Sequence, residues 1–509
     1  MTTTLLRNGS IHGTPGATAL AVEDGRIVFI GSDDRSTAYD GAGEMVDLRG
    51  AWVAPAFVDA HVHLVQTGDQ LAGLDLTGAT GRADALDRLA RHARDLADDA
   101  VIVGHGWDET TWPDPSYPTA DDVERAAPGR RVYLSRVDGH SAIVSHALLA
   151  EVPEARERDG YAADGRLQRT AKHTVSDRLA DLVGPDQRLE SARRAVRHLA
   201  AAGVGAFHEN AAPHIGPTYE LALVRRAAAE VGLHATTYWG ELGAFDKVDQ
   251  LGVAGLAGDL VADGAVGSRT AAMREEYADC AGHRGHAYLD PAQIADHVTG
   301  CTERGIQAGF HCIGDAALDA IGEGFARAAE KLGPDAVRRQ RHRLEHCEMP
   351  SAETIALLAD LGVVASVQPM FDGLWGGPDK MYAARLGERW TGVNPFRDLH
   401  AAGVRLAFGS DSPVTPMQPW SAVLAAVRHH TPDQGLTPTQ AFHAHTAGGW
   451  AAARFDDAGV LAVGHAATYA VWDTPAGLAG DRLPELDGDL PRLRRTVVDG
   501  RTVHAEENQ

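Results

Sequence analysis

The sequence contains few cysteines and no long apolar run. Its 509 residues include four cysteines, which are too few and too irregularly spaced for a disulfide framework: Cys280, Cys301, Cys312 and Cys347. We therefore expect free thiols. No apolar run is long enough to cross a bilayer, and the first nine residues lack the pattern of a secretory signal. These absences lead us to expect a soluble, cytoplasmic protein with no membrane partner.

Positive charge is also scarce. Lysine and arginine together number 47 against 70 aspartates and glutamates, which gives a formal net charge of −23. An acidic surface repels a nucleic-acid backbone, so we expect no nucleic-acid partner and favour a small-molecule substrate. Dimers are the commonest assemblies of soluble proteins, and the sequence leaves a homodimer open.

The two ends of the chain share one pattern. Short apolar runs alternate with turn residues near both termini, in segments 4–7, 19–22, 27–30, 468–472 and 495–498. Neither end alone has enough strands to close a core. We therefore predict one composite β-sandwich domain, built from residues 1–54 and 455–509.

Between the ends, short β-branched or aromatic segments alternate with helical stretches, which is typical of a parallel α/β protein. The candidate strands number eight: 57–61, 203–208, 232–238, 259–263, 306–311, 341–346, 363–368 and 404–409. Eight is the count of a (β/α)8 TIM-like barrel, which we place at residues 55–454, although a doubly wound sheet alternates in the same way. The connection after the first strand is too long for one crossover helix, so we predict an inserted subdomain at about 68–190, over the barrel mouth.

Metal-ligand residues follow several of these strands. His61 and His63 end the first strand two residues apart, so both can point to one face, although two packed histidines would show the same spacing. Three further strands end in residues of ligand type: His311, His346 and Asp411. Because the strands of a barrel end at one rim, these side chains should converge, and convergence favours a metal site over chance packing.

Seven segments carry a family resemblance: residues 55–63, 104–108, 138–140, 263–270, 311–315, 343–346 and 409–414. In their order they resemble the amidohydrolase superfamily, and within it the family-3 (YtcJ-like) branch that includes N-substituted formamide deformylase. The resemblance spans nearly the whole chain. It implies a metal-dependent barrel, a composite β-domain and hydrolysis of C–N bonds other than peptide bonds.

The resemblance also locates a departure from the family pattern. Relatives usually carry a lysine four residues before Asp263, where its carbamate can bridge two metals, and this chain has Asp259 there. Aspartate is shorter than a carbamylated lysine and would need a backbone shift to reach both ions. We therefore favour one tightly held ion, with two still open. Imidazole ligands suit zinc, and other divalent transition metals are not excluded.

Mononuclear members of the superfamily suggest four ligands for one ion: His61, His63, His311 and Asp411. His346 would then polarise the substrate carbonyl or exchange a proton with the bound water, and with two ions it would be a ligand too. The expected reaction is attack of metal-bound hydroxide on an amide carbon, with Asp411 passing the proton to the leaving nitrogen. A mononuclear-zinc deaminase or cyclic-amide hydrolase is the first alternative. A non-catalytic regulatory relative, motivated by Asp259 and by Thr468 where relatives often have aspartate, is the second.

Other candidates have both a functional and a structural interpretation. Five could contact substrate or simply pack: His140, Trp107, Asp263, Arg269 and Tyr238. For Asp263 and Arg269 the structural alternative is a pair that orders their loop. Glu209 could add a carboxylate to the site, although a polar strand end facing solvent is the simpler interpretation. Cys312 and Cys347 directly follow ligand histidines, so alternation directs them into the core.

Overall fold

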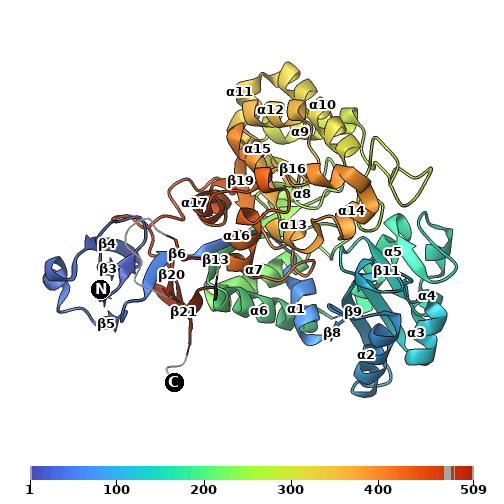
Figure 1. The fold of residues 1–509 in the computed structure, drawn as a ribbon, viewed down its shortest axis with the longest axis horizontal. Helices are drawn as coiled ribbons and strands as arrows, with labels where there is room; N and C mark the ends of the chain where they lie inside the picture. Colours follow the sequence, from blue (N-terminus) through green and yellow to red (C-terminus); the bar gives the residue numbers. More distant parts are fainter. Residues whose placement is uncertain (1–2, 183, 475–482, 487, 507–509) are drawn as a thin grey trace.

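The computed structural model describes residues 3–182, 184–474, 483–486 and 488–506. Figure 1 shows three parts in a row: the sheets of the two termini, a central region of parallel strands, and an inserted sheet at the far end. Within the described residues, no helix is both long and apolar enough to cross a membrane. All four cysteines are free.

Eight parallel strands form the centre of the molecule, in two sheets of order β14-β13-β7 and β15-β16-β17-β18-β19. Their bounds are β7 Phe57–Val62, β13 Val204–Ala211, β14 His234–Trp239, β15 Gly255–Leu256, β16 Gln307–Cys312, β17 Arg343–His346, β18 Val364–Val367 and β19 Arg405–Phe408. Backbone contacts join the sheets at both seams. Ala254 N–H donates to Thr237 O at 2.9 Å, and Asp411 N–H donates to His61 O at 2.7 Å.

Helices follow these strands and bury their apolar faces against them. The helices of this region are α1 Leu64–Ala72, α6 Pro185–Ala201, α7 Glu220–Val231, α8 Lys247–Leu251, α9 Pro291–Glu303, α10 Asp315–Leu332, α11 Pro334–Gln340, α12 Ala352–Asp360, α13 Pro369–Trp375, α14 Met381–Leu386, α15 Phe396–Ala401, α16 Pro419–Val427, α17 Pro438–Ala444 and α18 Ala447–Ala452. In α10, Leu318, Ile321 and Phe325 recur every three or four residues and are fully buried. The helix ends before Gly333, whose φ of 84° leaves the helical region.

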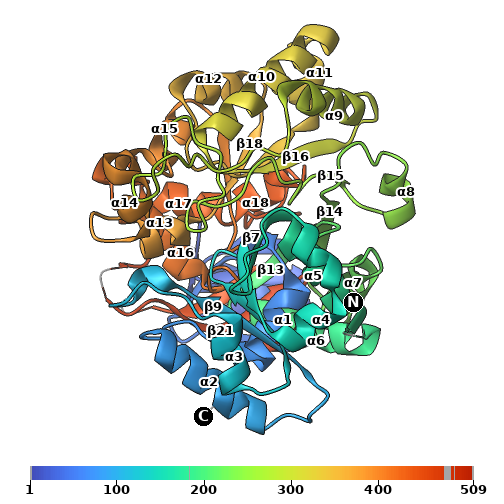
Figure 2. The same cartoon turned by 90° about the vertical axis from the view of Figure 1, so that its right-hand side faces the viewer.

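The inserted part lies between β7 and β13 and has a sheet of its own, of order β12-β11-β10-β9-β8. Its elements are β8 Leu74–Asp75, α2 Arg82–Arg94, β9 Val101–Trp107, α3 Ala120–Ala126, β10 Arg131–Arg136, β11 Ser141–Val144, α4 His146–Glu151, β12 Arg166–Gln168 and α5 Arg169–Leu182. Figure 2 looks onto this part, which lies in front of β7 and β13. Two buried apolar clusters belong to it.

The two termini build a pair of sheets around one buried apolar cluster. One sheet holds β1 Thr3–Arg7, β3 Ala19–Glu23, β4 Arg26–Gly31 and β5 Glu44–Asp47. The other combines strands from both ends of the chain: β2 Ser10–Ile11, β6 Trp52–Pro55, β20 Tyr469–Asp473, β21 Arg492–Val498 and β22 Arg501–Ala505. Strand β6 pairs with β20, so the second sheet contains residues more than 400 positions apart in sequence.

Two of the expected strands differ from the structure. The segment 259–263 is not a strand, because the fourth parallel strand is Gly255–Leu256 and the chain bends at Gly258, whose φ is 79°. Val261 keeps a single bridge to His311. Strand β13 extends to Ala211, three residues beyond the predicted end, so Glu209 lies inside a buried strand and does not face solvent.

Candidate metal centre

The two histidines of the first strand lie where β7 gives way to α1. Both are buried, at 0% and 5% exposure for His61 and His63. The turn is held by Thr67, whose hydroxyl donates to His63 O at 2.7 Å, and by Glu209, whose carboxylate accepts from Leu64 N–H at 3.0 Å. These contacts fix the direction of His63 relative to the strand.

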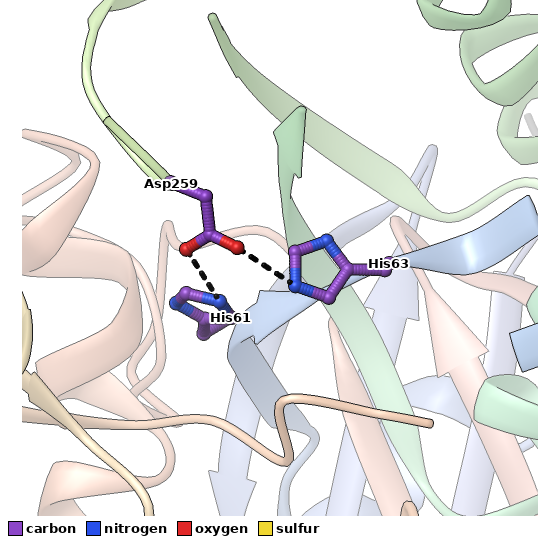
Figure 3. A group of neighbouring side chains, drawn as sticks. All are labelled: His61, His63 and Asp259. Carbon is purple, nitrogen blue, oxygen red and sulfur yellow. Dashed lines mark ion pairs between the residues drawn. The ribbon is translucent and has the colours of Figure 1, made fainter. Parts of the chain in front are cut away.

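Two carboxylates meet these histidines, from the bend after β15 and from the end of β19 (Figure 3 shows the first). The oxygens of Asp259 lie 3.4 Å from His61 Nε2 and 3.3 Å from His63 Nε2. Asp411 Oδ1 lies 3.2 Å and 3.1 Å from the same two nitrogens. Four side chains from three elements therefore direct their polar atoms to one point.

Two more histidines complete the group. His311 Nδ1, at the end of β16, lies 3.9 Å from Asp259 Oδ1, and the rings of His311 and His346 are 4.4 Å apart between centroids. His346 Nδ1 lies 2.8 Å from Gln368 Oε1. An amide oxygen only accepts, so Nδ1 carries the proton and Nε2 keeps a free lone pair.

We call these six side chains the metal group. They form three overlapping triads, and within each triad the ligand atoms lie within 4.8 Å of one another: His61–His63–Asp259, His61–His346–Asp411 and Asp259–His311–His346. A buried polar atom without a partner is costly. Within the described residues, four atoms of this group are buried and have no hydrogen-bond partner: His61 Nε2, His63 Nδ1, Asp259 Oδ1 and His346 Nε2. Imidazole and carboxylate donors left open in this way fit a divalent cation.

The charges of the group explain its pKa values. Burial lowers the pKa of His61, but Asp411 and Asp259 outweigh burial and raise the pKa to about 10. Burial would raise the pKa of Asp411, and the neighbouring histidines hold it below the usual range. For His346 burial dominates, and with the field of His311 it lowers the pKa to about 3. The group therefore pairs ionised carboxylates with at least one neutral imidazole.

Backbone conformation contributes to the convergence. His346 and Asp411 have φ angles of 68° and 54°, in the left-handed region that non-glycine residues rarely adopt. Such conformations persist where the surrounding structure enforces them, and they concentrate at functional sites. Asp59 contributes to this enforcement, because its carboxylate accepts Ser410 N–H at 2.9 Å beside the end of β19.

A buried ion pair lies beneath the group. Glu345 Oε2 is 2.8 Å from His61 Nδ1 and accepts from Arg343 Nη2 at 3.0 Å. Arg343 also donates to Ala60 O at 2.7 Å, on strand β7 of the other parallel sheet. The sequence analysis missed this pair, although its signal is present: residues 343 and 345 alternate onto one face of β17.

The predicted substrate residue His140 lies at the site. It comes from the loop after β10 of the inserted part, and its ring centroid is 4.9 Å from that of His311. Burial lowers its pKa to about 3, so the ring is neutral. His140 lines a pocket with His311, His346 and Asp411, and the lining also includes the aromatic side chains of Phe371, Trp375 and Tyr382. We call this the metal-side pocket.

The structure does not bring the other four candidates into this group. Trp107 is buried in the inserted part and donates its indole N–H to Leu134 O at 2.9 Å. Arg269 forms two hydrogen bonds with the carboxylate of Asp279, at 2.9 Å and 2.7 Å. Tyr238 donates to Gln307 Oε1 at 2.9 Å.

Asp263 and Glu209 hold backbone. Asp263 accepts three backbone N–H groups, from residues 272, 313 and 314, at 2.8 to 2.9 Å. Glu209 caps the start of α1, and burial raises its pKa to about 8. Cys312 and Cys347 lie in the main apolar core, at 0% and 1% exposure.

Comparison with known proteins gives relatives that match most of the chain. The putative amidohydrolase YtcJ of Bacillus subtilis is 27% identical over 434 residues, which cover 80% of this chain and 80% of that protein. N-substituted formamide deformylase of Arthrobacter pascens is 25% identical over 530 residues, covering 95% of this chain and 94% of that protein. These matches confirm the resemblance seen in the sequence.

A solved structure supports the fold. The crystal structure of an uncharacterized metal-dependent hydrolase from Pyrococcus horikoshii superimposes with a TM-score of 0.73 at 24% identity, covering 93% of this chain and 97% of that chain. The model of the amidohydrolase family matches residues 44–504. The chain therefore belongs to the amidohydrolase family, and this membership supports a hydrolytic function.

Proposed function

We propose that the protein is a metal-dependent amidohydrolase that cleaves an amide-like C–N bond of a small molecule. The observation that carries the proposal is the convergence of four histidines and two aspartates, which come from five separate strand ends or the bends after them. We further propose that the eight parallel strands act as one (β/α)8 barrel, with the composite terminal sheets as a β-sandwich attached to it.

The ligands that we assign to the metal site are the members of the three triads: His61, His63, Asp259, His311, His346 and Asp411. Zinc is our first choice because imidazole dominates the donor set. A divalent ion in this position acidifies a water molecule and polarises a carbonyl. With its proton on Nδ1, His346 turns the unprotonated Nε2 to the site. This nitrogen can bind a metal but cannot donate a hydrogen bond to the substrate carbonyl, so we favour the ligand role.

Asp411 is the proton carrier in this proposal. Its depressed pKa keeps it ionised, so it can take a proton from water as the water oxygen attacks the amide carbon. The C–N bond then breaks, and the same proton passes to the leaving nitrogen, which leaves as an amine beside a carboxylate product. Neutral His140 faces the metal-side pocket and can donate a hydrogen bond to the carbonyl oxygen as negative charge develops there.

The walls of the metal-side pocket favour a substrate with an apolar or aromatic part. His346 stacks on Phe371 with ring planes 9° apart, and Trp375 and Tyr382 continue the same wall. A flat, apolar group can lie against these rings while the amide faces the ligand group. Together with the name of the deformylase relative, this makes N-substituted formamides with aromatic substituents the first compounds to test.

The test measures formate and amine released from such a panel. Treatment with a chelator should abolish release and added zinc should restore it, while His63→Ala should stay inactive after zinc is added. Release of ammonia without an amine product would indicate deamination instead. Hydrolysis that persists in the chelated protein would overturn the proposal.

A further inference from the structure

A second cavity lies beside the metal-side pocket, between the inserted part and helix α1. We call it the side cavity; the lining residues used below are Asp69, His105, Tyr133, Lys172, Ser176 and Val414. Val414 lines both hollows, and the loop residues 139 and 140 line one each. The two hollows therefore adjoin at Val414.

The inserted part presents a polar wall to the side cavity. Strands β9 and β10 are parallel neighbours, so His105 and Tyr133, on the two strands, face the cavity on one side of their sheet. Lys172 and Ser176 lie four residues apart on α5 and share the face of the helix that closes the cavity. The hydroxyls of Tyr133 and Ser176 are 3.3 Å apart, so one of them donates to the other and one proton remains available.

Lys172 brings an uncompensated positive charge to this wall. Arg136 and Arg188 also line the cavity, but they pair with carboxylates, including those of Asp138 and Glu220. Among the residues that the structure describes, Lys172 alone of the cavity's lysines and arginines forms no ion pair. The cavity's carboxylate, Asp69, accepts a hydrogen bond from Ser191 and does not pair with Lys172.

A buried imidazole nitrogen without a hydrogen-bond partner lies on the same wall. His105 Nε2 is buried without a hydrogen-bond partner among the described residues. Burial lowers the pKa of His105 to about 4, with a smaller contribution from Lys172, so the ring is neutral. A lone cation, a free hydroxyl and an open imidazole nitrogen together match the charge and the acceptor oxygens of a carboxylate.

We propose that the side cavity binds a carboxylate group of the substrate, with Lys172 as its charge partner. This inference rests on the proposed function, because it places the carboxylate on the molecule whose amide faces the metal group. The substrate class is then an acylated amino acid or a related amide acid. The inserted part thereby becomes the element that selects the substrate.

The test compares each acid with its neutral amide: N-benzoylglycine with N-benzoylglycinamide, N-acetylphenylalanine with its amide, and N-formylmethionine with its amide. Dissociation constants are measured by calorimetry on the zinc-loaded protein. A charge-assisted contact should favour the acid about 10-fold in at least one pair. Lys172→Met should remove that preference and Lys172→Arg should largely keep it. Lys331→Met, an exposed lysine on α10, is the matched control and should change nothing.

Two results overturn the inference: no preference for the acid in any pair, or a preference that Lys172→Met leaves intact. Metal-dependent hydrolysis of neutral formamides is followed in parallel. Intact hydrolysis without an acid preference rejects the side cavity alone. A Lys172-dependent acid preference with no hydrolysis of any compound rejects the proposed function and keeps the carboxylate site.

Discussion

Glu345 Oε2 lies 2.8 Å from His61 Nδ1, and both side chains are fully buried. Burial would raise the pKa of Glu345, but Arg343 and His61 lower it to about 2, so the carboxylate is ionised and can only accept. Nδ1 of His61 therefore carries a proton, and Nε2 faces Asp259 and Asp411. A charged pair on β17 thus orients the ring of His61, which we propose as a metal ligand, on β7.

Glu345→Gln should weaken metal binding by about 10- to 100-fold, because the amide holds the His61 tautomer less firmly. Competition with a chromophoric chelator measures the affinity. Glu241→Gln, which removes a carboxylate paired with Lys247, is the control and should bind metal normally. Unchanged affinity in the Glu345 variant would reject the positioning role.

Because that variant also leaves Arg343 buried without its charge partner, a loss of about 3–5 kcal/mol in unfolding free energy is expected as well.

A double replacement separates the two effects. Arg343→Met with Glu345→Met removes both charges, so most of the lost stability should return. Metal affinity should stay low because His61 still lacks its acceptor. If the double variant regains metal affinity together with stability, Glu345 acts through folding alone.

Asp259 is shared by the triad of His61 and His63 and by the triad of His311 and His346. With Asp411 the first set offers four ligand side chains, whereas the second offers three. We therefore predict one tightly held ion per chain and a second that binds more weakly. Asp259→Asn should abolish the second ion and weaken the first, as measured by metal content after dialysis at rising zinc concentrations. Asp279→Asn is the control, and a wild-type metal count in Asp259→Asn would contradict the shared role.

The convergence at the metal group was predictable from the sequence because strand ends in a parallel α/β fold meet at one edge. The two-residue spacing of His61 and His63 predicted that both face the same side. The positions of His311 and His346 at strand ends predicted that they join this group. Asp259 was harder to place. A strand at 259–263 would hold its short side chain away from the second pair of histidines, and the bend at Gly258 removes that restriction.

Contacts between distant segments were not predictable. Nothing in the local sequence indicates that Gln368 orients His346, or that Lys172 faces a cavity beside α1. The same applies to Asp263, whose place in a motif gives no sign that it holds three backbone N–H groups. Such roles depend on how the inserted part and the loops pack, which residue spacing does not determine.

Asp263→Ala should destabilise the fold, because three buried N–H groups lose their acceptor. The expected loss in unfolding free energy is about 3 kcal/mol or more, measured by urea denaturation. Arg269→Met, which breaks an exposed pair with Asp279, should cost less than about 1 kcal/mol. A stable Asp263→Ala protein that has lost hydrolysis would instead assign Asp263 to the substrate.

His140→Ala should lower kcat on a hydrolysed formamide by about 100- to 1,000-fold, because one donor to the developing oxyanion is lost. Metal content should not change, since His140 is absent from the three triads. Trp107→Phe is the control for a conservative change in the inserted part. If His140→Ala loses its metal while kcat per bound ion is unchanged, His140 is a ligand and not a donor.

Elemental analysis of the purified chain tests the central claim most directly. After exposure to zinc and removal of the excess, the wild-type protein should retain about one ion per chain or more. The double variant His61→Ala, His63→Ala should retain almost none while remaining folded. A wild-type protein that holds no tightly bound metal, or a double variant that keeps the full amount, would contradict the account.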